Sequence, residues 1–178
     1  YNNLKLIFVG RLVDQKDPQT FFNALKIISN KIKFKAIIIG KGIYLNELKK
    51  FTNENKMKNF VKFLGWQNNP FKYLRSADML ILTSKYEGLP NVLLEAVYLK
   101  KFIISSKCKT GPKEILDNGR GGELFKIGDH IQLAKKIVEY SKSKKKYNKK
   151  INFAYKRLYR FDYKKNLNMY LKLIKTHL

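Results

Sequence analysis

MLILTSKYEGLPNVLLEA, the stretch from Met79 to Ala96, joins an apolar segment to a polar loop and then to a second apolar pattern. The four residues from Met79 to Leu82 are all apolar, which is typical of a short buried strand. Gly88 and Pro90 predict a loop that ends where a helix begins, and we expect the helix over Val92 to Tyr98. A strand that leads through a loop into a helix is the unit from which parallel sheets are built.

The same unit recurs along the rest of the chain. Asp17 and Pro18 predict an N-cap and a first-turn proline before a helix over Thr20 to Asn30. The other predicted strands are Leu6 to Val9, Ala36 to Ile39, Phe60 to Leu64, Phe102 to Ser105 and Gly122 to Phe125, and further helices are expected over Leu45 to Asn55, after Pro112, and from about His130 to the end. This alternation predicts an α/β fold: a doubly wound parallel sheet of about six strands with helices on both faces and an all-helical carboxyl-terminal segment.

Length and composition indicate one globular domain over residues 1–178. The hydrophobic content is 44%, and domains commonly have about 100 to 200 residues. The longest apolar runs have four residues, whereas about 20 are needed to cross a bilayer. The single cysteine, Cys108, cannot form an intramolecular disulfide, and the chain starts with Tyr1 rather than Met. We therefore expect a reducing compartment and a fragment of a longer protein.

The charge of the chain is strongly positive. There are 38 Lys and Arg against 13 Asp and Glu, a formal charge of +25. Such a field attracts phosphate groups, whether they belong to nucleic acid, a membrane surface or a small ligand. The densest run, Lys142 to Lys150, is interpreted as a solvated face, with contact to anionic lipid or another polyanion as the alternative. Charge alone leaves the partner open.

Basic residues and glycines follow several predicted strands, and ligands of doubly wound sheets bind beyond the carboxyl ends of the strands. Arg11 and Lys16 flank the end of the first strand, where both can reach one diphosphate or can simply be neighbouring cations. Gly40 and Gly42 lie between a strand and a helix, where backbone N–H groups approach a phosphate, although an ordinary tight turn has the same pattern. The dinucleotide pattern needs a third glycine where Leu45 stands, so NAD binding is disfavoured.

Two of the few acidic residues, Glu87 and Glu95, flank the predicted start of the helix after Pro90. A carboxylate in the loop and another in the second helical turn can accept hydrogen bonds from two hydroxyl-bearing parts of one ligand. The alternative is an acid that favours the helix dipole and an ordinary surface glutamate. The exposed amino end of the same helix offers N–H groups to a phosphate.

The sequence lacks the residue patterns of a metal site and of a nucleophilic triad. His130 and His177 are far apart in the sequence, no His or Cys cluster has the spacing of metal ligands, and no Asp-x-Asp is present to hold a divalent ion. Ser84, Cys108 and Thr110 have no evident His partner, which argues against a nucleophilic triad. We therefore predict no metal site.

Several ordered motifs occur together: Phe8-Val9-Gly10-Arg11-Leu12 with Lys16, Ile39-Gly40-Lys41-Gly42, Phe63-Leu64-Gly65-Trp66, Ala77-Asp78, Gly111-Pro112-Lys113-Glu114-Ile115, Gly128-Asp129 and, most specifically, an E-x7-E element from Glu87 to Glu95 within Ser84 to Ala96. The set resembles the carboxyl-terminal domain of retaining GT-B glycosyltransferases, and most closely family 4, the glycosyl transferases group 1. The resemblance covers essentially the whole chain. It implies a Rossmann-like fold, the carboxyl-terminal half of GT-B.

The resemblance also implies roles for the candidate residues. Arg11 and Lys16 would neutralise the donor diphosphate, and Glu87 would bond hydroxyls of the donor sugar. Glu95 would hold the ribose hydroxyls. Further substrate-binding positions implied along the chain are Gly10, Gly40, Gly42, Gly65, Trp66, Gln67, Gly88, Leu89 and Asn91. Neither a metal nor a cofactor is required in this family, because cations and helix N–H groups stabilise the leaving nucleoside diphosphate.

The implied function is transfer of a sugar, with retention of configuration, from UDP-sugar or less commonly GDP-sugar to a glycan or lipid-linked acceptor. We expect a role in bacterial surface polysaccharide synthesis, such as lipopolysaccharide or capsule. We expect a cytoplasmic location with possible peripheral contact to the anionic inner leaflet, and no nucleic acid partner. The amino-terminal acceptor domain is absent from the 178 residues, so the chain is expected to bind donor with little or no turnover. Its terminal helices should fold onto their own domain or stay partly exposed.

Two alternatives stay open. A UDP-N-acetylglucosamine 2-epimerase shares the architecture but lacks the arrangement from Ser84 to Ala96. A non-enzymatic polyanion- or nucleic-acid-binding module is supported by charge alone, without a recognition motif. One continuous stripe of lysines would favour a polyanion, whereas lysines scattered around a cleft with Glu87 and Glu95 favour a sugar nucleotide.

Overall fold

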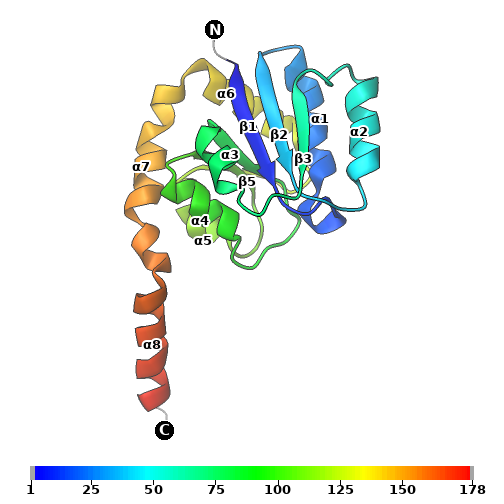
Figure 1. Cartoon of the computed structure of the whole chain (residues 1–178). Helices are drawn as coiled ribbons and strands as arrows, with labels where there is room; N and C mark the ends of the chain where they lie inside the picture. The colour runs from blue at the N-terminus through cyan, green and yellow to red at the C-terminus, as the bar shows by residue number, and fades with distance from the viewer. Residues whose placement is uncertain (1–2, 177–178) are drawn as a thin grey trace.

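The computed structural model describes residues 3–176 and consists of one parallel sheet covered by helices on both faces (Figure 1). The six strands have the order β3-β2-β1-β4-β5-β6, and every neighbouring pair is parallel. The strands are β1 (Leu4–Val9), β2 (Phe34–Ile39), β3 (Val61–Gly65), β4 (Met79–Leu82), β5 (Phe102–Ser106) and β6 (Glu123–Phe125). The predicted doubly wound α/β sheet is confirmed.

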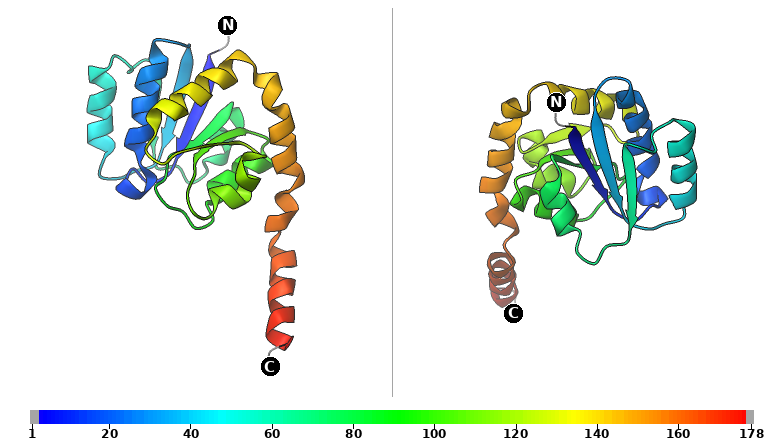
Figure 2. Two further views of the ribbon diagram at one scale, coloured as in Figure 1. Left: turned by 180° about the vertical axis from the view of Figure 1, so that it is seen from behind. Right: turned by 45° about the horizontal axis from the view of Figure 1, so that its top comes forward.

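One apolar core lies on each face of the sheet because successive residues of a strand point to opposite sides. Leu6 and Phe8 of β1 pack in one core, and Ile7 between them packs in the other. The first core is covered by α1 (Pro18–Ser29), α2 (Leu45–Glu54) and α6 (His130–Lys142), seen in front of the sheet in the left view of Figure 2. The second is covered by α3 (Phe71–Ser76), α4 (Asn91–Tyr98), α5 (Pro112–Ile115) and α7 (Asn148–Lys156).

Most predicted elements are present within a few residues of their expected bounds. Asp17 caps α1 as predicted, since its carboxylate accepts from the Thr20 backbone N–H at 3.1 Å and Pro18 takes the first turn. The unpredicted elements include the six-residue helix α3 and the 3-10 helix η1 (Asp14–Lys16). Both are too short to show a helical apolar period in the sequence.

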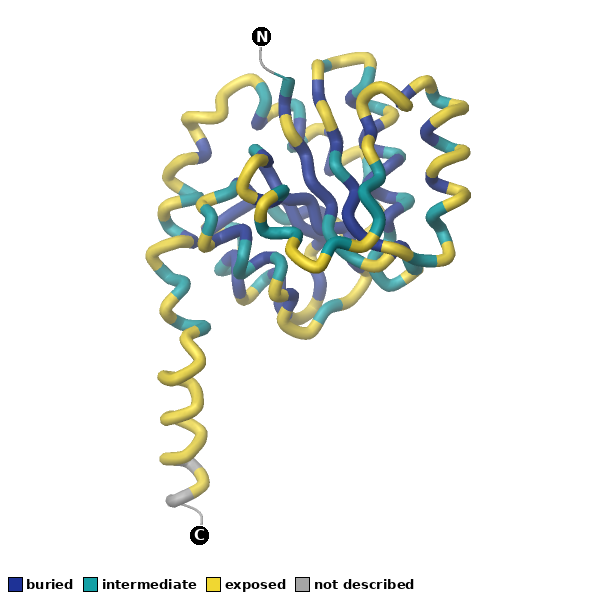
Figure 3. Tube along the Cα trace, viewed as in Figure 1, coloured by how far each residue is buried: buried dark blue, intermediate teal, exposed yellow. Residues whose placement is uncertain are grey.

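The carboxyl-terminal segment is helical, as predicted, but it breaks into several pieces. After α6 come the 3-10 helix η3 (Lys144–Tyr147), α7, the 3-10 helix η4 (Leu158–Phe161) and α8 (Tyr163–Thr176). Helix α8 extends away from the sheet and is exposed along its described length (Figures 1 and 3). The exposed alternative is therefore the correct one for this helix. Within the described residues, no helix is long and apolar enough to span a membrane. Tyr1, Asn2 and His177 lie outside the described residues.

The ends of β1 and β2 are packed backbone against backbone. Gly40 has φ of +141°, and a Cβ atom there would lie 1.9 Å from the Gly10 carbonyl oxygen. At Gly42 a Cβ atom would lie 2.2 Å from the Leu12 carbonyl oxygen, which accepts from the Tyr44 N–H at 3.2 Å. Close packing of the two loops therefore accounts for both glycines without any ligand, as the tight-turn alternative expects.

We predict that Gly42→Ala destabilises the protein because the added methyl group forces the two loops apart. Overpacking costs about 1–3 kcal/mol, so the melting temperature should fall by roughly 2–12 °C. Thermal unfolding followed by circular dichroism measures this effect. Gly88→Ala is the matched control, because nothing lies within 4 Å of a Cβ atom at Gly88. Equal melting temperatures for Gly42→Ala and wild type would contradict the assigned packing role.

Candidate functional site

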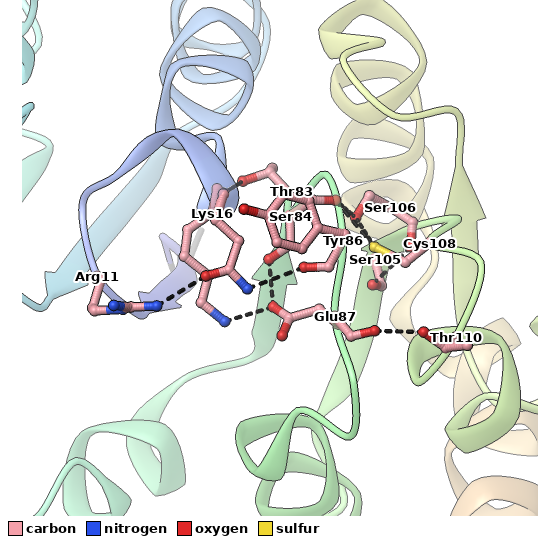
Figure 4. A network of polar contacts seen from close by, with 11 residues as sticks. Arg11, Lys16, Thr83, Ser84, Tyr86, Glu87, Ser105, Ser106, Cys108 and Thr110 are labelled. Atoms are coloured by element: carbon pink, nitrogen blue, oxygen red, sulfur yellow. Dashed lines mark hydrogen bonds and ion pairs between the residues drawn. The ribbon is translucent and has the colours of Figure 1, made fainter.

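Three loops meet beyond the carboxyl ends of β1, β4 and β5 (Figure 4). They are residues 10–17 after β1, residues 83–90 after β4 and residues 107–111 after β5. The sheet order changes direction between β1 and β4, and ligands of doubly wound sheets bind at such a switch point. The predicted site residues Arg11, Lys16 and Glu87 all lie on these loops.

An ion pair joins the first two loops. The Lys16 ammonium donates to Oε1 of Glu87 at 2.6 Å, and only 17% and 6% of the two side chains are exposed. The Ser84 hydroxyl donates to the same Oε1 atom at 2.6 Å. Within the described residues, Oε2 of Glu87 accepts no hydrogen bond, and it points away from Lys16 and Ser84 in Figure 4. Glu87 is thus fixed by one oxygen while the other stays available.

Backbone contacts also join the first loop to the second. The Thr83 hydroxyl donates to the Lys16 carbonyl oxygen at 2.8 Å. The Lys85 N–H donates to the Gln15 carbonyl oxygen at 2.9 Å, and the Gln15 side-chain amide donates to the Tyr86 carbonyl oxygen at 3.2 Å. The ion pair therefore lies between loops whose backbones are already held in register.

The third loop supports the second. The Ser106 hydroxyl and the Cys108 thiol both donate to the Ser84 carbonyl oxygen, at 2.6 and 3.1 Å, and the Thr110 hydroxyl donates to the Glu87 carbonyl oxygen at 2.5 Å. Burial raises the pKa of the Cys108 thiol above its ordinary value of 9.0, which keeps it protonated and able to donate. Cys108 is thus a structural donor here.

Groups that suit a diphosphate line the open side of these loops. The exposed Arg11 guanidinium bonds to the side-chain oxygen of Gln15 at 2.9 Å on the same loop as Lys16. Helix α4 begins after Pro90 without a side-chain cap. Its first N–H groups and those of the exposed Gly88 and Leu89 are thus available to an anion, and the helix dipole favours negative charge there.

The loop after β3 lies farther along the same edge of the sheet, beyond the loop after β2. Gly65 has φ of +67° and Trp66 is 64% exposed. Both polar ends of the Gln67 side chain are bonded inside the loop, the amide nitrogen to the Leu64 carbonyl oxygen at 2.9 Å and the oxygen to the Tyr73 hydroxyl at 3.2 Å. Gln67 therefore shapes this loop, and its amide keeps one further N–H donor and one acceptor position.

Glu95 lies in the second turn of α4, as predicted, but its surroundings differ from those of Lys16 and Glu87. It lines a pocket of about 730 Å³ whose walls are half aromatic, and Arg11, Lys16 and Glu87 do not line this pocket. The pocket is lined by Phe71, Leu94, Glu95, Tyr98, Tyr155, Lys156, Leu158, Tyr159, Phe161 and Asp162. Burial raises the pKa of the Glu95 carboxyl above its ordinary value of 4.5.

The structure thus brings Arg11, Lys16 and Glu87 together, with the amino end of α4 beside them. Asn91 is the first, exposed residue of that helix. Sequence reasoning missed the supporting hydroxyl groups. Only the contact of Ser84 with Glu87 had a local signal, because Ser84 stands three residues before Glu87 in the sequence. Ser106 and Thr110 reach the site through the pairing of β4 with β5. Among the described residues, no three His, Cys, Asp or Glu side chains gather as metal ligands.

We predict that Glu95→Gln raises the melting temperature at pH 7, because the half-buried carboxylate is disfavoured in its charged form. A raised pKa makes ionisation of this group destabilising, so the advantage of Gln should shrink as the pH falls toward 4.5 and vanish below it. Thermal unfolding at several pH values measures this trend. Glu139→Gln, at an exposed position of α6, is the control and should change little. A lower melting temperature for Glu95→Gln at pH 7 would show that the carboxylate is stabilised instead.

Comparison with known sequences gives a family. The model for glycosyl transferases group 1 matches residues 2–157. The chain is 40% identical over 111 residues to an uncharacterized glycosyltransferase of Methanocaldococcus jannaschii. These residues make up 62% of the chain and 27% of the relative. It is 32% identical over 174 residues, 95% of the chain and 47% of the relative, to an undecaprenol-linked glycan α-1,4-N-acetyl-D-galactosaminyltransferase of Campylobacter jejuni. The chain spans half or less of the length of these curated relatives.

Comparison with solved structures gives the same fold. The lipopolysaccharide outer core galactosyltransferase WaaB superimposes with a TM-score of 0.84 and 28% identity, over 99% of this chain and 50% of WaaB. HepE of Anabaena, solved with UDP and glucose, has a TM-score of 0.87 and 22% identity, over 99% of this chain and 49% of HepE. Both the sequence match and the fold agree with the expected resemblance. The chain belongs to the glycosyl transferases group 1 family, and its fold is that of the carboxyl-terminal domain of GT-B glycosyltransferases.

Proposed function

We propose that the chain carries the donor site of a retaining, metal-independent glycosyltransferase whose donor is a UDP-sugar. The observation that carries the proposal is the meeting of Arg11 and Lys16 with the uncapped amino end of α4 at the switch point of the sheet. Two cations and several free N–H groups suit a diphosphate better than any uncharged ligand. The structure of HepE with UDP and glucose supports the choice of a uridine nucleotide.

The diphosphate is the leaving group in this proposal. Arg11 offers a planar guanidinium, Lys16 an ammonium, and Gly88 and Leu89 backbone N–H groups. These donors are positioned before the reaction, so charge that develops on the departing phosphate is stabilised without reorganisation. No divalent ion is then needed, and the lack of an Asp-x-Asp in the sequence supports this part of the proposal.

Each carboxylate has a separate task. Glu87 accepts from a hydroxyl of the donor sugar through Oε2, because Oε1 already accepts from Lys16 and Ser84. Glu95 accepts from the ribose hydroxyls, and among the described residues it has no ionic partner, which suits a group that accepts from a neutral donor. The loop with Trp66 faces the base.

In the proposed reaction the bond between the anomeric carbon and the phosphate oxygen breaks, and a bond from the same carbon to the acceptor oxygen forms. The acceptor attacks from the face of the leaving group, so configuration is retained. Its hydroxyl proton passes to the departing phosphate oxygen. No side chain of the chain acts as a nucleophile, in agreement with the role of Cys108 as a buried donor to the Ser84 carbonyl oxygen.

The acceptor is proposed to be a glycan or a lipid-linked glycan of a bacterial surface polysaccharide. Relatives include the undecaprenol-linked transferase of Campylobacter jejuni and the lipopolysaccharide 1,6-galactosyltransferase of Salmonella typhimurium. Acceptor binding and turnover would need chain beyond these residues.

We also propose a cytoplasmic location with peripheral contact to anionic lipid. Co-sedimentation with phosphatidylglycerol vesicles at physiological ionic strength tests this contact.

The positions of the lysines favour a sugar nucleotide over a polyanion. Exposed lysines occur on helices from both faces of the sheet and on the projecting helix, as Lys26, Lys49, Lys72, Lys135 and Lys164 illustrate. They form no single stripe on one element, whereas Arg11 and Lys16 share one loop at the switch point. The high charge therefore adds general attraction for phosphate rather than a nucleic-acid interface.

Calorimetric titration with UDP, GDP, ADP and NAD at about 150 mM salt tests the proposal, since this ionic strength screens weak surface attraction. We expect saturable one-to-one binding of UDP that is indifferent to added magnesium. NAD should not bind, because Leu45 replaces the third glycine of the dinucleotide pattern. Absence of binding by both UDP and GDP would contradict a donor site in this chain.

A paired substitution tests the diphosphate role. Arg11→Ala with Lys16→Ala should weaken UDP by about tenfold or more, because charge-assisted hydrogen bonds to phosphate are lost, and should change uridine little. Lys49→Ala with Lys135→Ala removes the same charge from exposed positions of α2 and α6 and is the control. If UDP and uridine lose affinity alike, the pair does not contact the diphosphate.

A further inference from the structure

We propose that Ser84 is a positioning residue for Glu87, and that Ser106 and Cys108 hold Ser84 in place. The inference rests on the proposed donor site, in which Glu87 contacts the sugar. It adds a hydroxyl that touches no part of the substrate but decides which carboxylate oxygen the substrate meets. All three supporting side chains are fully buried.

The first step concerns the rotation of the Glu87 carboxylate. Lys16 alone would hold it loosely, since an ammonium is a compact charge with rotatable donors and can bond either oxygen. Ser84 and Lys16 both donate to Oε1 at 2.6 Å, from the segments that follow two different strands, β4 and β1. Two donors on one oxygen fix the plane of the carboxylate, so Oε2 is left for a hydroxyl group from outside.

The second step concerns the position of Ser84 itself. Its carbonyl oxygen accepts two hydrogen bonds, from the Ser106 hydroxyl at 2.6 Å and from the Cys108 thiol at 3.1 Å. Ser106 and Cys108 also approach each other, with 3.5 Å between the hydroxyl oxygen and the sulfur. This pair ties the end of β4 to the end of β5, so the Ser84 hydroxyl starts from a rigid backbone.

The third step concerns specificity. The nucleotide would bind through Arg11, Lys16, the helix N–H groups and Glu95. Of these, Lys16 shares a hydrogen-bond partner with Ser84, the Oε1 atom of Glu87, and it would keep that bond without the Ser84 hydroxyl. Only the sugar would meet Oε2 of Glu87. Loss of the Ser84 hydroxyl should therefore weaken recognition of the sugar and leave recognition of the nucleotide intact.

Calorimetry with Ser84→Ala and wild type, each titrated with UDP and with UDP-glucose, UDP-galactose, UDP-N-acetylglucosamine and UDP-N-acetylgalactosamine, tests the inference. We expect Ser84→Ala to bind UDP within about twofold of wild type. The best UDP-sugar of wild type should bind about tenfold more weakly, the size expected when one hydrogen bond to a charged group loses its geometry. A purely structural role would instead lower both affinities together.

Two further variants complete the comparison. Ser105→Ala is the matched control. Ser105 is also fully buried in β5, but within residues 3–176 its hydroxyl bonds only to the adjacent Ser106 carbonyl oxygen, so both affinities should stay unchanged. Cys108→Ser keeps a donor to the Ser84 carbonyl oxygen and should bind like wild type. Ser106→Ala with Cys108→Ala removes both donors and should reproduce the selective loss of sugar binding.

The outcomes separate this inference from the proposed function. If wild type prefers a UDP-sugar to UDP and Ser84→Ala keeps that preference in full, the positioning role is wrong while the donor site stands. Equal losses for UDP and UDP-sugar in a folded Ser84→Ala protein also overturn it. If wild type binds neither UDP nor any UDP-sugar, the proposed function fails, and the inference fails with it.

Discussion

The ion pair between Lys16 and Glu87 is the constraint on which the site depends. It bridges two loops that are 71 residues apart in the sequence, and it is almost removed from solvent. Removal of two charges from water offsets much of their attraction, so the pair adds little to stability by itself. Its effect is geometric, because it fixes a cation and a carboxylate side by side at the point where the sheet order changes direction.

The topology explains why these groups can meet at all. Strand β1 lies beside β4, and β4 lies beside β5, so the loops that follow the three strands are neighbours in space. Each loop then supports the next: Thr83 bonds to the backbone of Lys16, and Thr110 bonds to the backbone of Glu87. The same arrangement leaves the amino end of α4 without a side-chain cap, beside these loops. The edge of the sheet thus presents cations, a carboxylate and N–H groups in fixed relative positions, as the proposed stabilisation of a leaving diphosphate requires.

The sequence was a good guide wherever the physical signal is local. Apolar runs predicted the strands, Asp17-Pro18 predicted the start of α1, and the motif from Ser84 to Ala96 indicated the loop and helix of the site. Contacts that depend on strand register could not be predicted, and the bonds from Ser106 and Cys108 to Ser84 are of this kind, across 22 and 24 residues. The sequence also did not indicate the pocket around Glu95, because its walls come from helices that are far apart in the chain. The glycines after β2 were predicted to contact substrate, and the sequence did not indicate their close backbone packing against Gly10 and Leu12 after β1.

A crystal structure of the protein with UDP is the decisive experiment for the proposed donor site. We expect the diphosphate to lie between Arg11, Lys16 and the N–H groups of Gly88 and Leu89, with the ribose hydroxyls within hydrogen-bond distance of Glu95. The Lys16–Glu87 contact should persist, with Oε2 of Glu87 facing the end of the diphosphate where the sugar would be attached. Density for UDP in the aromatic pocket alone, or a diphosphate that touches neither Arg11 nor Lys16, would contradict the account.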